Sequence, residues 1–223
     1  MTSWSHSNPP PGPQGSKEPV VYVVDDDESM RLALDGLLRS IGLQVQTFDS
    51  TQAFLAYVRR DVPSCLILDV RLRGESGLAF QEQMEKSGVH MPIVFMTGHG
   101  DIAMTVKAMK AGAVDFLAKP FRDQDMLDAV ASALARDGER LHAERSGAAL
   151  RQAFDALTLR EREVLRFVVA GLMNKQIAAE LNLSEVTVKV HRGQVMKKLA
   201  ARSVADLVRM AEALGVEPLQ RAT

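Results

Sequence analysis

The stretch that decides the fold is Val20-Val21-Tyr22-Val23-Val24-Asp25-Asp26-Asp27, a short apolar run that ends in three acids. Its β-branched residues predict a strand that is buried on both faces, which is typical of a parallel sheet. Cys65-Leu66-Ile67-Leu68-Asp69 repeats the pattern, and Ile93-Val94-Phe95-Met96-Thr97 repeats it with a terminal hydroxyl. These runs indicate an α/β domain.

Amphipathic patterns separate the apolar runs. Helices are expected over residues 29–41, 51–60, 78–86, 101–111 and 123–135, with Asp49 or Ser50 and Asp101 as N-caps of the second and fourth. Two further strands are expected over 43–48 and 113–118. Five strand-helix pairs with short connections predict a (βα)5 α/β fold with a parallel sheet.

Composition sets outer limits on the function. The 223 residues are 46% hydrophobic and 25% charged, and 27 basic against 28 acidic side chains give a net charge of -1. Wholesale disorder and a uniformly basic nucleic-acid coat are excluded, whereas a local basic patch is not. The single cysteine, Cys65, excludes an intramolecular disulfide and fits the cytoplasm. We expect no membrane partner, because no apolar run approaches the roughly 18–20 residues of a span.

The pattern changes along the chain and predicts two domains. Residues 1–18 are rich in proline, glycine and serine and are expected to be a disordered tail, and residues 19–136 hold the α/β domain. A charged, part-helical linker is expected over 137–153. Residues 154–215 read as four helices before a tail over 216–223.

The first of these helices has a capping box, Thr158 with Glu161. An apolar stripe follows it, formed by Leu159, Val164, Leu165 and Val168. Residues 150–223 carry 12 basic and 8 acidic side chains, and residues 1–149 carry 15 and 20. The near-zero total is therefore the sum of an acidic and a basic half.

Polar side chains follow the predicted strands at their carboxyl ends, which in an open parallel sheet border the ligand crevice. They are Asp25, Asp26, Asp69, Thr97 and Lys119. Neighbouring carboxylates repel each other unless a hard cation lies among them, and oxygen ligands suit Mg²⁺. With a lysine and a hydroxyl donor, the set matches phosphoryl transfer to a carboxylate.

The four motifs that hold these residues resemble the receiver domain of two-component response regulators. They are Val-Val-Asp25-Asp26, Leu-Ile-Leu-Asp69, Met-Thr97-Gly-His-Gly and Phe116-Leu-Ala-Lys119-Pro120, and the segment from Thr97 to Pro120 is most similar to the NarL/FixJ group. The resemblance implies a flavodoxin-like fold, with Asp69 phosphorylated by a sensor histidine kinase.

The same resemblance implies roles for the other site residues. Mg²⁺ would be bound by Asp25, Asp26, Asp69 and the Arg71 backbone carbonyl. Lys119 would pair with the acceptor and then with the phosphoryl oxygens, and Thr97 would swing toward the phosphoryl group. Gly98 would leave room for the phosphate, and Phe116 would turn inward behind Thr97.

Two positions depart from the receiver pattern. Leu72 and Arg73 stand where the family usually has Met-Pro, so the following loop is less fixed and kinase docking or phosphoryl lifetime is open to change. Phe116 replaces the commoner tyrosine, so the switch position has no phenolic hydroxyl.

The basic half contains a candidate helix-turn-helix, formed by residues 174–181, a turn, and residues 184–199. The second helix places four residues on one face, where lysine can read guanine and valine can touch a thymine methyl: Lys189, Val190, Gly193 and Lys197. Contacts to the DNA backbone are expected from Asn174, Lys175, Thr187, His191 and Lys198.

Three motifs in this half resemble the LuxR-type DNA-binding domain: Leu-Thr-Leu-Arg-Glu-Arg-Glu-Val-Leu, Asn-Lys-Gln-Ile-Ala and Thr-Val-Lys-Val-His. In that family the third helix lies in the groove of double-stranded DNA and the fourth pairs subunits. Gly193 departs from the family, which commonly has a longer polar side chain there, so sharp sequence specificity is in doubt.

The combined prediction is a transcription factor controlled by phosphorylation, which promotes homodimerisation and promoter binding on half-sites about one helical turn apart. We expect no enzyme beyond slow loss of its own phosphoryl group. One alternative is a DNA-binding protein whose receiver only dimerises. The other is a phosphohydrolase with an aspartyl-phosphate intermediate, which the arginine at position 71 disfavours because a second acid is usual there.

Overall fold

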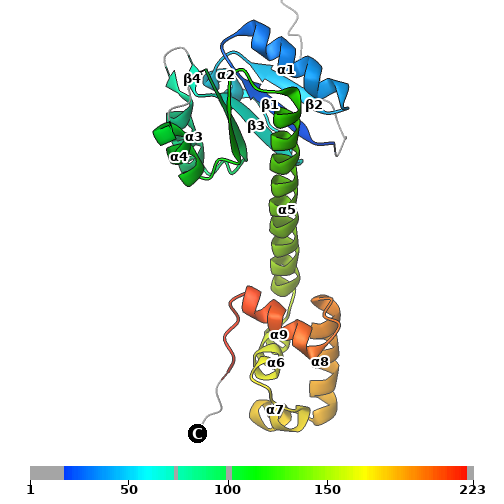
Figure 1. The fold of residues 1–223 in the computed structure, drawn as a ribbon. Helices are drawn as coiled ribbons and strands as arrows, with labels where there is room; N and C mark the ends of the chain where they lie inside the picture. Colours follow the sequence, from blue (N-terminus) through cyan, green and yellow to red (C-terminus); the bar gives the residue numbers. More distant parts are fainter. Residues whose placement is uncertain (1–17, 73–74, 99–101, 220–223) are drawn as a thin grey trace, which may run out of the picture. The chain divides into compact units, whose positions relative to one another are not determined.

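The computed structural model describes residues 18–72, 75–98 and 102–219, in two compact units, Met1–Leu141 and His142–Thr223 (Figure 1). Four expectations lie outside the described residues: the tail before residue 18, the effect of Arg73, the helix cap by Asp101 and the last part of the C-terminal tail.

A five-stranded parallel sheet forms the centre of the first unit, as predicted, in the order β2-β1-β3-β6-β7. Its strands are β1 (Val20–Val24), β2 (Gln44–Phe48), β3 (Ser64–Asp69), β6 (Ile93–Thr97) and β7 (Asp115–Ala118). A short antiparallel pair, β4 (Arg71–Leu72) with β5 (Glu75–Ser76), follows β3. The wholly buried strands β1, β3 and β6 are the three apolar runs of the sequence, which is why those runs lack alternation.

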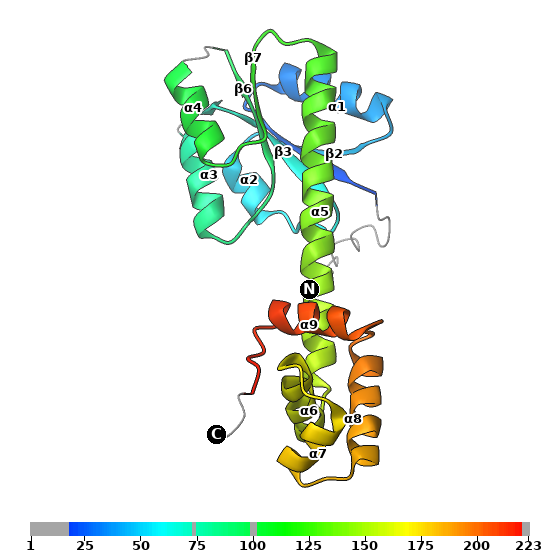
Figure 2. The same cartoon turned by 60° about the horizontal axis from the view of Figure 1, so that its bottom comes forward.

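Helices cover both faces of the sheet (Figures 1 and 2). On one face, α1 (Glu28–Ser40) and the N-terminal part of α5 (Asp123–Asp155) pack on side chains such as Val21 and Val23. On the other face, α2 (Thr51–Ala56), α3 (Gly77–Lys86) and α4 (Ile102–Lys110) pack on side chains such as Tyr22 and Val24. Alternate residues of one strand thus enter two cores.

Three element boundaries differ from expectation for identifiable reasons. The expected helix 51–60 ends at Ala56, because Tyr57 adopts extended backbone and packs on Tyr22 and Phe48. The expected strand 113–118 begins only at Asp115. Its first residues complete the end of α4, where the Ala113 amide donates to the Ala108 carbonyl.

The third difference concerns the expected helix 123–135 and linker 137–153. They form one continuous helix, α5, through Asp155. Asp137 lies buried within it and accepts a hydrogen bond from the Ser64 amide at 2.8 Å and an ion pair from Arg140 at 2.8 Å. These contacts hold the helix at the point where the glycine-containing sequence suggests a break.

The second unit consists of the C-terminal end of α5 and four helices: α6 (Leu159–Val169), α7 (Asn174–Leu181), α8 (Glu185–Lys198) and α9 (Val204–Ala213). The expected Thr158–Glu161 capping box is present, and Ser184 and Ser203 cap α8 and α9. Leu159 is an exception, because it is 82% exposed and lies outside the core. Leu157, two residues earlier, takes the buried place instead.

Candidate functional site

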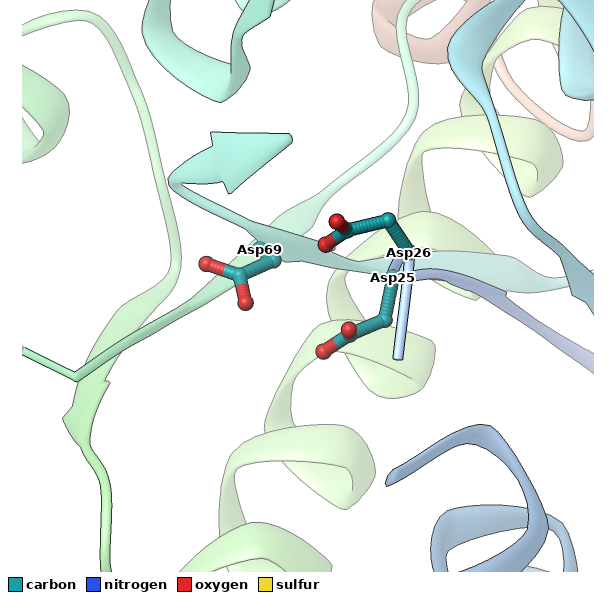
Figure 3. A group of neighbouring side chains, drawn as sticks. All are labelled: Asp25, Asp26 and Asp69. Atoms are coloured by element: carbon teal, nitrogen blue, oxygen red, sulfur yellow. The ribbon is translucent and has the colours of Figure 1, made fainter. Parts of the chain in front are cut away.

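Three acids lie together at the carboxyl edge of the sheet (Figure 3). Asp25 and Asp26 come directly after β1, and Asp69 is the last residue of the neighbouring strand β3. One carboxylate oxygen from each lies within 4.8 Å of the others. Asp25 has no exposed surface and Asp69 is 8% exposed, whereas Asp26 is half-buried, so two of the three acids are largely removed from water.

The third acid of the run after β1 has a different role. Asp27 is the N-cap of α1 and accepts a hydrogen bond from the Ser29 amide at 2.8 Å. Its own amide donates to the Asp25 carboxylate at 2.9 Å, which fixes the orientation of that side chain. Asp27 lies outside the acidic group.

Lys119 bridges two of the carboxylates. Its ammonium lies 2.6 Å from Asp69 Oδ2 and 2.8 Å from Asp25 Oδ2. The residue follows β7, and its amide donates to the Thr97 carbonyl at 2.7 Å, which extends the β6–β7 pairing by one step. Parallel pairing therefore brings together side chains that are 50 and 94 positions apart in sequence.

Burial and charge act in opposite directions on these groups. Burial raises the pKa of Asp25 above its ordinary value, although hydrogen bonds from Lys119 and the Asp27 amide lower it. Burial lowers the pKa of Lys119, but its hydrogen bonds to Asp25 and Asp69 outweigh that effect, so the pKa of Lys119 is raised. The lysine is therefore held charged against the two acids.

The remaining predicted residues lie on or directly after β6 and β7 and in the loop after β3. Thr97 is fully buried at the end of β6, and the exposed Gly98 follows it. Phe116 is half-buried on β7, its ring centroid 6.2 Å from that of Phe95. The Arg71 amide donates to Asp69 Oδ1 at 2.9 Å, which ties the loop after β3 to the acid.

Gly77 is a site residue that the sequence analysis missed. A Cβ atom there would lie 2.5 Å from the Asp69 backbone oxygen and 3.1 Å from the Val70 Cα. The Gly77 amide also donates to the Val70 carbonyl at 2.9 Å. Only glycine fits this close approach to the backbone of the acidic residue, and the sequence signal for it is the lone glycine at the start of a helix.

The acidic group fits a hard divalent cation. Three carboxylates offer only oxygen atoms, and they are placed closely enough to share one ion. A lysine on one side supplies a fixed positive charge. The site thus has the parts needed to bind a cation together with a phosphoryl group.

The second unit offers a separate candidate site on α8. Val188, Val195 and Leu199 are buried in its core. The opposite side of the helix is exposed and includes Lys189, Val190, Gly193 and Lys197. The turn at Asn182 and Leu183 joins α7 to α8, with Asn182 in the left-handed conformation. This is helix-turn-helix geometry with one basic outer face.

The residues expected to contact the DNA backbone differ in their exposure and in their bonds within the chain. Lys175 is exposed and His191 is half-buried. The other side chains make intramolecular bonds: Asn174 Oδ1 accepts from Arg192 at 2.9 Å, and the Thr187 and Ser184 hydroxyls are 2.8 Å apart.

Lys198 also makes intramolecular bonds. Its ammonium lies 2.7 Å from Glu161 Oε2 and 3.1 Å from the Ala156 carbonyl, which accepts a hydrogen bond from it. The side chain expected to contact the DNA backbone is thus engaged within the second unit. The residue holds the last turn of α8 against the start of α6.

Within the described ranges 18–72, 75–98 and 102–219, no helix has the length and apolar character needed to cross a membrane.

Comparison with known proteins covers nearly the whole chain. The family model for the response regulator receiver domain matches residues 21–131, and that for the bacterial regulatory proteins of the luxR family matches residues 155–211. Neither is a family of enzymes.

Individual relatives agree with these matches. Nodulation protein W of Bradyrhizobium diazoefficiens is 55% identical over 203 residues, which cover 91% of this chain and 89% of that protein. The transcriptional regulatory protein FixJ of Azorhizobium caulinodans is 44% identical over 204 residues, covering 91% and 96%. The solved structure of the response regulator StyR is 51% identical with a TM-score of 0.80, covering 87% of this chain and 98% of that one.

Full-length FixJ from B. japonicum is 39% identical with a TM-score of 0.51, covering 88% of this chain and 97% of the other. A receiver domain implies a histidine kinase partner, and a luxR-family domain implies binding to DNA. The chain therefore belongs to the two-component response regulators that join a receiver domain to a LuxR-type DNA-binding domain and regulate transcription.

Proposed function

We propose that Asp69 is the residue that accepts a phosphoryl group from the histidine kinase, and that this event controls DNA binding. The observation that carries the proposal is the bridge from Lys119 to Asp69 and Asp25. A fixed cation beside a nearly buried carboxylate orients it for attack and can follow the negative charge that the phosphoryl group brings.

In the proposed step, an Asp69 carboxylate oxygen attacks the phosphorus of a phosphohistidine. A P–O bond forms as the P–N bond breaks, and the imidazole leaves with the electron pair and takes up a proton. The Arg71 amide, which donates to Asp69 Oδ1, and Lys119, which binds Oδ2, orient the carboxylate. Positioning and charge neutralisation are the main contributions expected for such a transfer.

We assign Mg²⁺ as the cofactor, held by Asp25, Asp26, Asp69 and the Arg71 backbone carbonyl. When bound, the ion neutralises charge on the carboxylates and on the incoming phosphoryl oxygens. Asp25 is oriented for this role by the Asp27 amide. The close grouping of three carboxylates supports the assignment.

The switch would begin at the end of β6. Thr97 would turn its hydroxyl toward the phosphoryl group, Gly98 would leave space for it, and Phe116 would move behind Thr97. These changes would alter the face formed by α4, β7 and α5 and promote homodimerisation. The half-buried position of Phe116 supports this role, because part of its surface is exposed and can still be buried.

DNA binding would use α8 in the major groove. Lys189, Val190, Gly193 and Lys197 lie on its exposed face. Asn174, Lys175, Thr187 and His191 would lie beside the DNA backbone. We do not include Lys198 among the proposed contacts to the DNA backbone, because its ammonium is bound by Glu161.

The test is mass spectrometry of the full chain after incubation with acetyl phosphate and Mg²⁺. We expect one phosphoryl adduct on the wild type and none on Asp69→Asn. Asp27→Asn is the matched control, because it removes a neighbouring acid outside the group and keeps a side chain that caps α1. An equal adduct on Asp69→Asn would refute the assigned acceptor.

A further inference from the structure

A cavity lies at the edge of the sheet opposite to the acidic group. Its volume is about 310 Å³, and its lining includes Ile93, where β6 begins, and the turn at Ala111 and Gly112 that precedes β7. Asp69 and Thr97 lie at the other ends of their strands, where β3 and β6 end. The cavity is therefore separate from the proposed phosphorylation site.

Two helices bring opposite charges to this cavity. Glu85 belongs to the last turn of α3, whereas Arg136 and Arg140 belong to α5. The two helices pack on opposite faces of the sheet (Figure 2). The acid and the two arginines therefore reach the cavity from different sides, which gives it one acidic wall and one basic wall.

The charges of the two walls do not pair with each other. Arg140 is bound by the buried Asp137 at 2.8 Å. Glu85 and Arg136 are exposed, and neither has an ion-pair partner within 4.0 Å among the residues that the structure describes. An acid and a base thus border one cavity and remain apart, which leaves space for a ligand to contact both.

A buried amide adds a polar group to the lining. Gln81 is 6% exposed, and its Nε2 donates to the Ala111 carbonyl at 2.7 Å. This bond fixes the orientation of the amide, because the reversed orientation would place two acceptors together. Gln81 Oε1 is then a buried acceptor with no hydrogen-bond partner in the described part of the chain. A bound molecule with a donor group would stabilise it.

The surface between the charged walls is apolar. Met84 and Ile93 are 1% and 4% exposed, and the half-buried Val89 and Met91 also line the cavity. Ligand sites in proteins are mostly apolar, contain a few polar groups and have volumes of roughly 300–1,000 Å³. A cavity near the lower end of this range suits one small molecule better than a peptide chain.

We propose that this cavity binds a free α-amino acid with an apolar side chain. The carboxylate would pair with Arg136, and the ammonium would pair with Glu85 and donate to Gln81. The side chain would lie on Met84 and Ile93. A zwitterion supplies both charges in one molecule, whereas an anion or a cation alone would leave one wall unpaired. The site would give the receiver domain a second input that does not depend on the proposed phosphorylation.

The first test titrates the full chain with L-leucine, L-methionine and L-phenylalanine and follows the backbone amide signals by NMR. At least one of them should shift the signals of Ile93, Ala111 and Gly112 in a saturable way. If none of the three amino acids shifts these signals, the proposal is overturned.

The second test removes one charge at a time from the tightest of these ligands. For leucine, the analogue without the ammonium is 4-methylpentanoate, and the analogue without the carboxylate is 3-methylbutylamine. Each should bind about tenfold more weakly than the amino acid, because one charged wall is left unpaired. Equal affinity for the amino acid and either analogue would overturn the proposal of a zwitterion.

Variants assign each charge of the ligand to its wall. Arg136→Gln should weaken binding of the amino acid about tenfold and leave binding of the amine analogue unchanged. Glu85→Gln should weaken binding of the amino acid equally and leave binding of the carboxylate analogue unchanged. Lys86→Gln is the matched control, because it removes an exposed charge from the next position of α3, outside the lining of the cavity.

The control should bind the amino acid with wild-type affinity. Unchanged hydrogen exchange of the β6 amides would show that the variants keep the fold of the first unit. Wild-type affinity of Arg136→Gln and Glu85→Gln, or an equal loss in Lys86→Gln, would overturn the proposed site.

Discussion

Replacing Lys198 by methionine is expected to loosen the second unit while leaving the number of DNA phosphate contacts unchanged. Methionine keeps most of the aliphatic stem and removes the ammonium. Glu161 then remains with a side chain only 6% exposed and without its cation. The Thr158 amide still donates to it at 2.7 Å, so the carboxylate keeps part of its stabilisation.

The size of the loss follows from the two bonds. The ammonium donates to Glu161 at 2.7 Å and to the Ala156 carbonyl at 3.1 Å. A hydrogen bond between charged groups contributes about 1.5–3 kcal/mol and a bond to a carbonyl about 1 kcal/mol. Lys198 is 32% exposed, which screens the pair to some extent. We expect the free energy of opening to fall by about 2–4 kcal/mol.

Native-state hydrogen exchange of amides in α6 and α8 measures this quantity without assuming one unfolding transition for the whole chain. Lys197→Met is the matched control at the adjacent exposed position, and its effect should stay within about 0.5 kcal/mol. In a double-mutant cycle, Glu161→Gln with Lys198→Met should show a coupling of about 1–3 kcal/mol.

The two variants should rank in the opposite order in DNA binding. Lys197→Met should lower the slope of log affinity against log salt concentration by about 0.9, whereas Lys198→Met should leave the slope unchanged. Equal destabilisation of the helices by Lys198→Met and Lys197→Met would refute the structural role of the Lys198–Glu161 ion pair. A lower salt slope for Lys198→Met would return that residue to the DNA contacts.

Three further predictions concern other parts of the chain. The Gly77→Ala variant should lose about 1–3 kcal/mol in thermal unfolding of the first unit and accept phosphate more slowly, because its Cβ would strike the Asp69 carbonyl. In the same unit, Asp137→Ala should lose about 1–3 kcal/mol, measured by exchange of the Ser64 amide, which would lose its acceptor. Burial raises the pKa of Glu161, but hydrogen bonds from Lys198 and Thr158 outweigh it, so its pKa is lowered. The second unit should therefore keep this stability above pH about 4.3, the value in the unfolded chain, and lose it as pH falls further; Lys198→Met should reduce this dependence.

Local chemistry accounts for what the sequence predicted well. The apolar runs at β1, β3 and β6 carry their own signal, because a strand buried on both faces has little place for polar residues. Capping residues such as Thr158 and Ser184 also act within one turn of helix. The grouping of the acids follows from the strand assignments, because parallel strands end at one edge of the sheet.

What the sequence could not supply depends on distant contacts. The continuity of α5 rests on Asp137, whose acceptor role for the Ser64 amide spans 73 positions. Two glycines, Gly138 and Gly147, cost about 1 kcal/mol each in a helix, too little to break one that is held elsewhere. The pairing of Lys198 with Glu161 spans 37 positions, so the sequence alone could not supply this contact.

The most direct test of the central claim is the affinity of the full chain for duplexes that the wild type selects from a random library, with and without acetyl phosphate and Mg²⁺. If phosphorylation of Asp69 controls DNA binding, the wild type and Asp27→Asn should bind more tightly after treatment, and Asp69→Asn should show no change. An equal gain in affinity for Asp69→Asn would contradict the account.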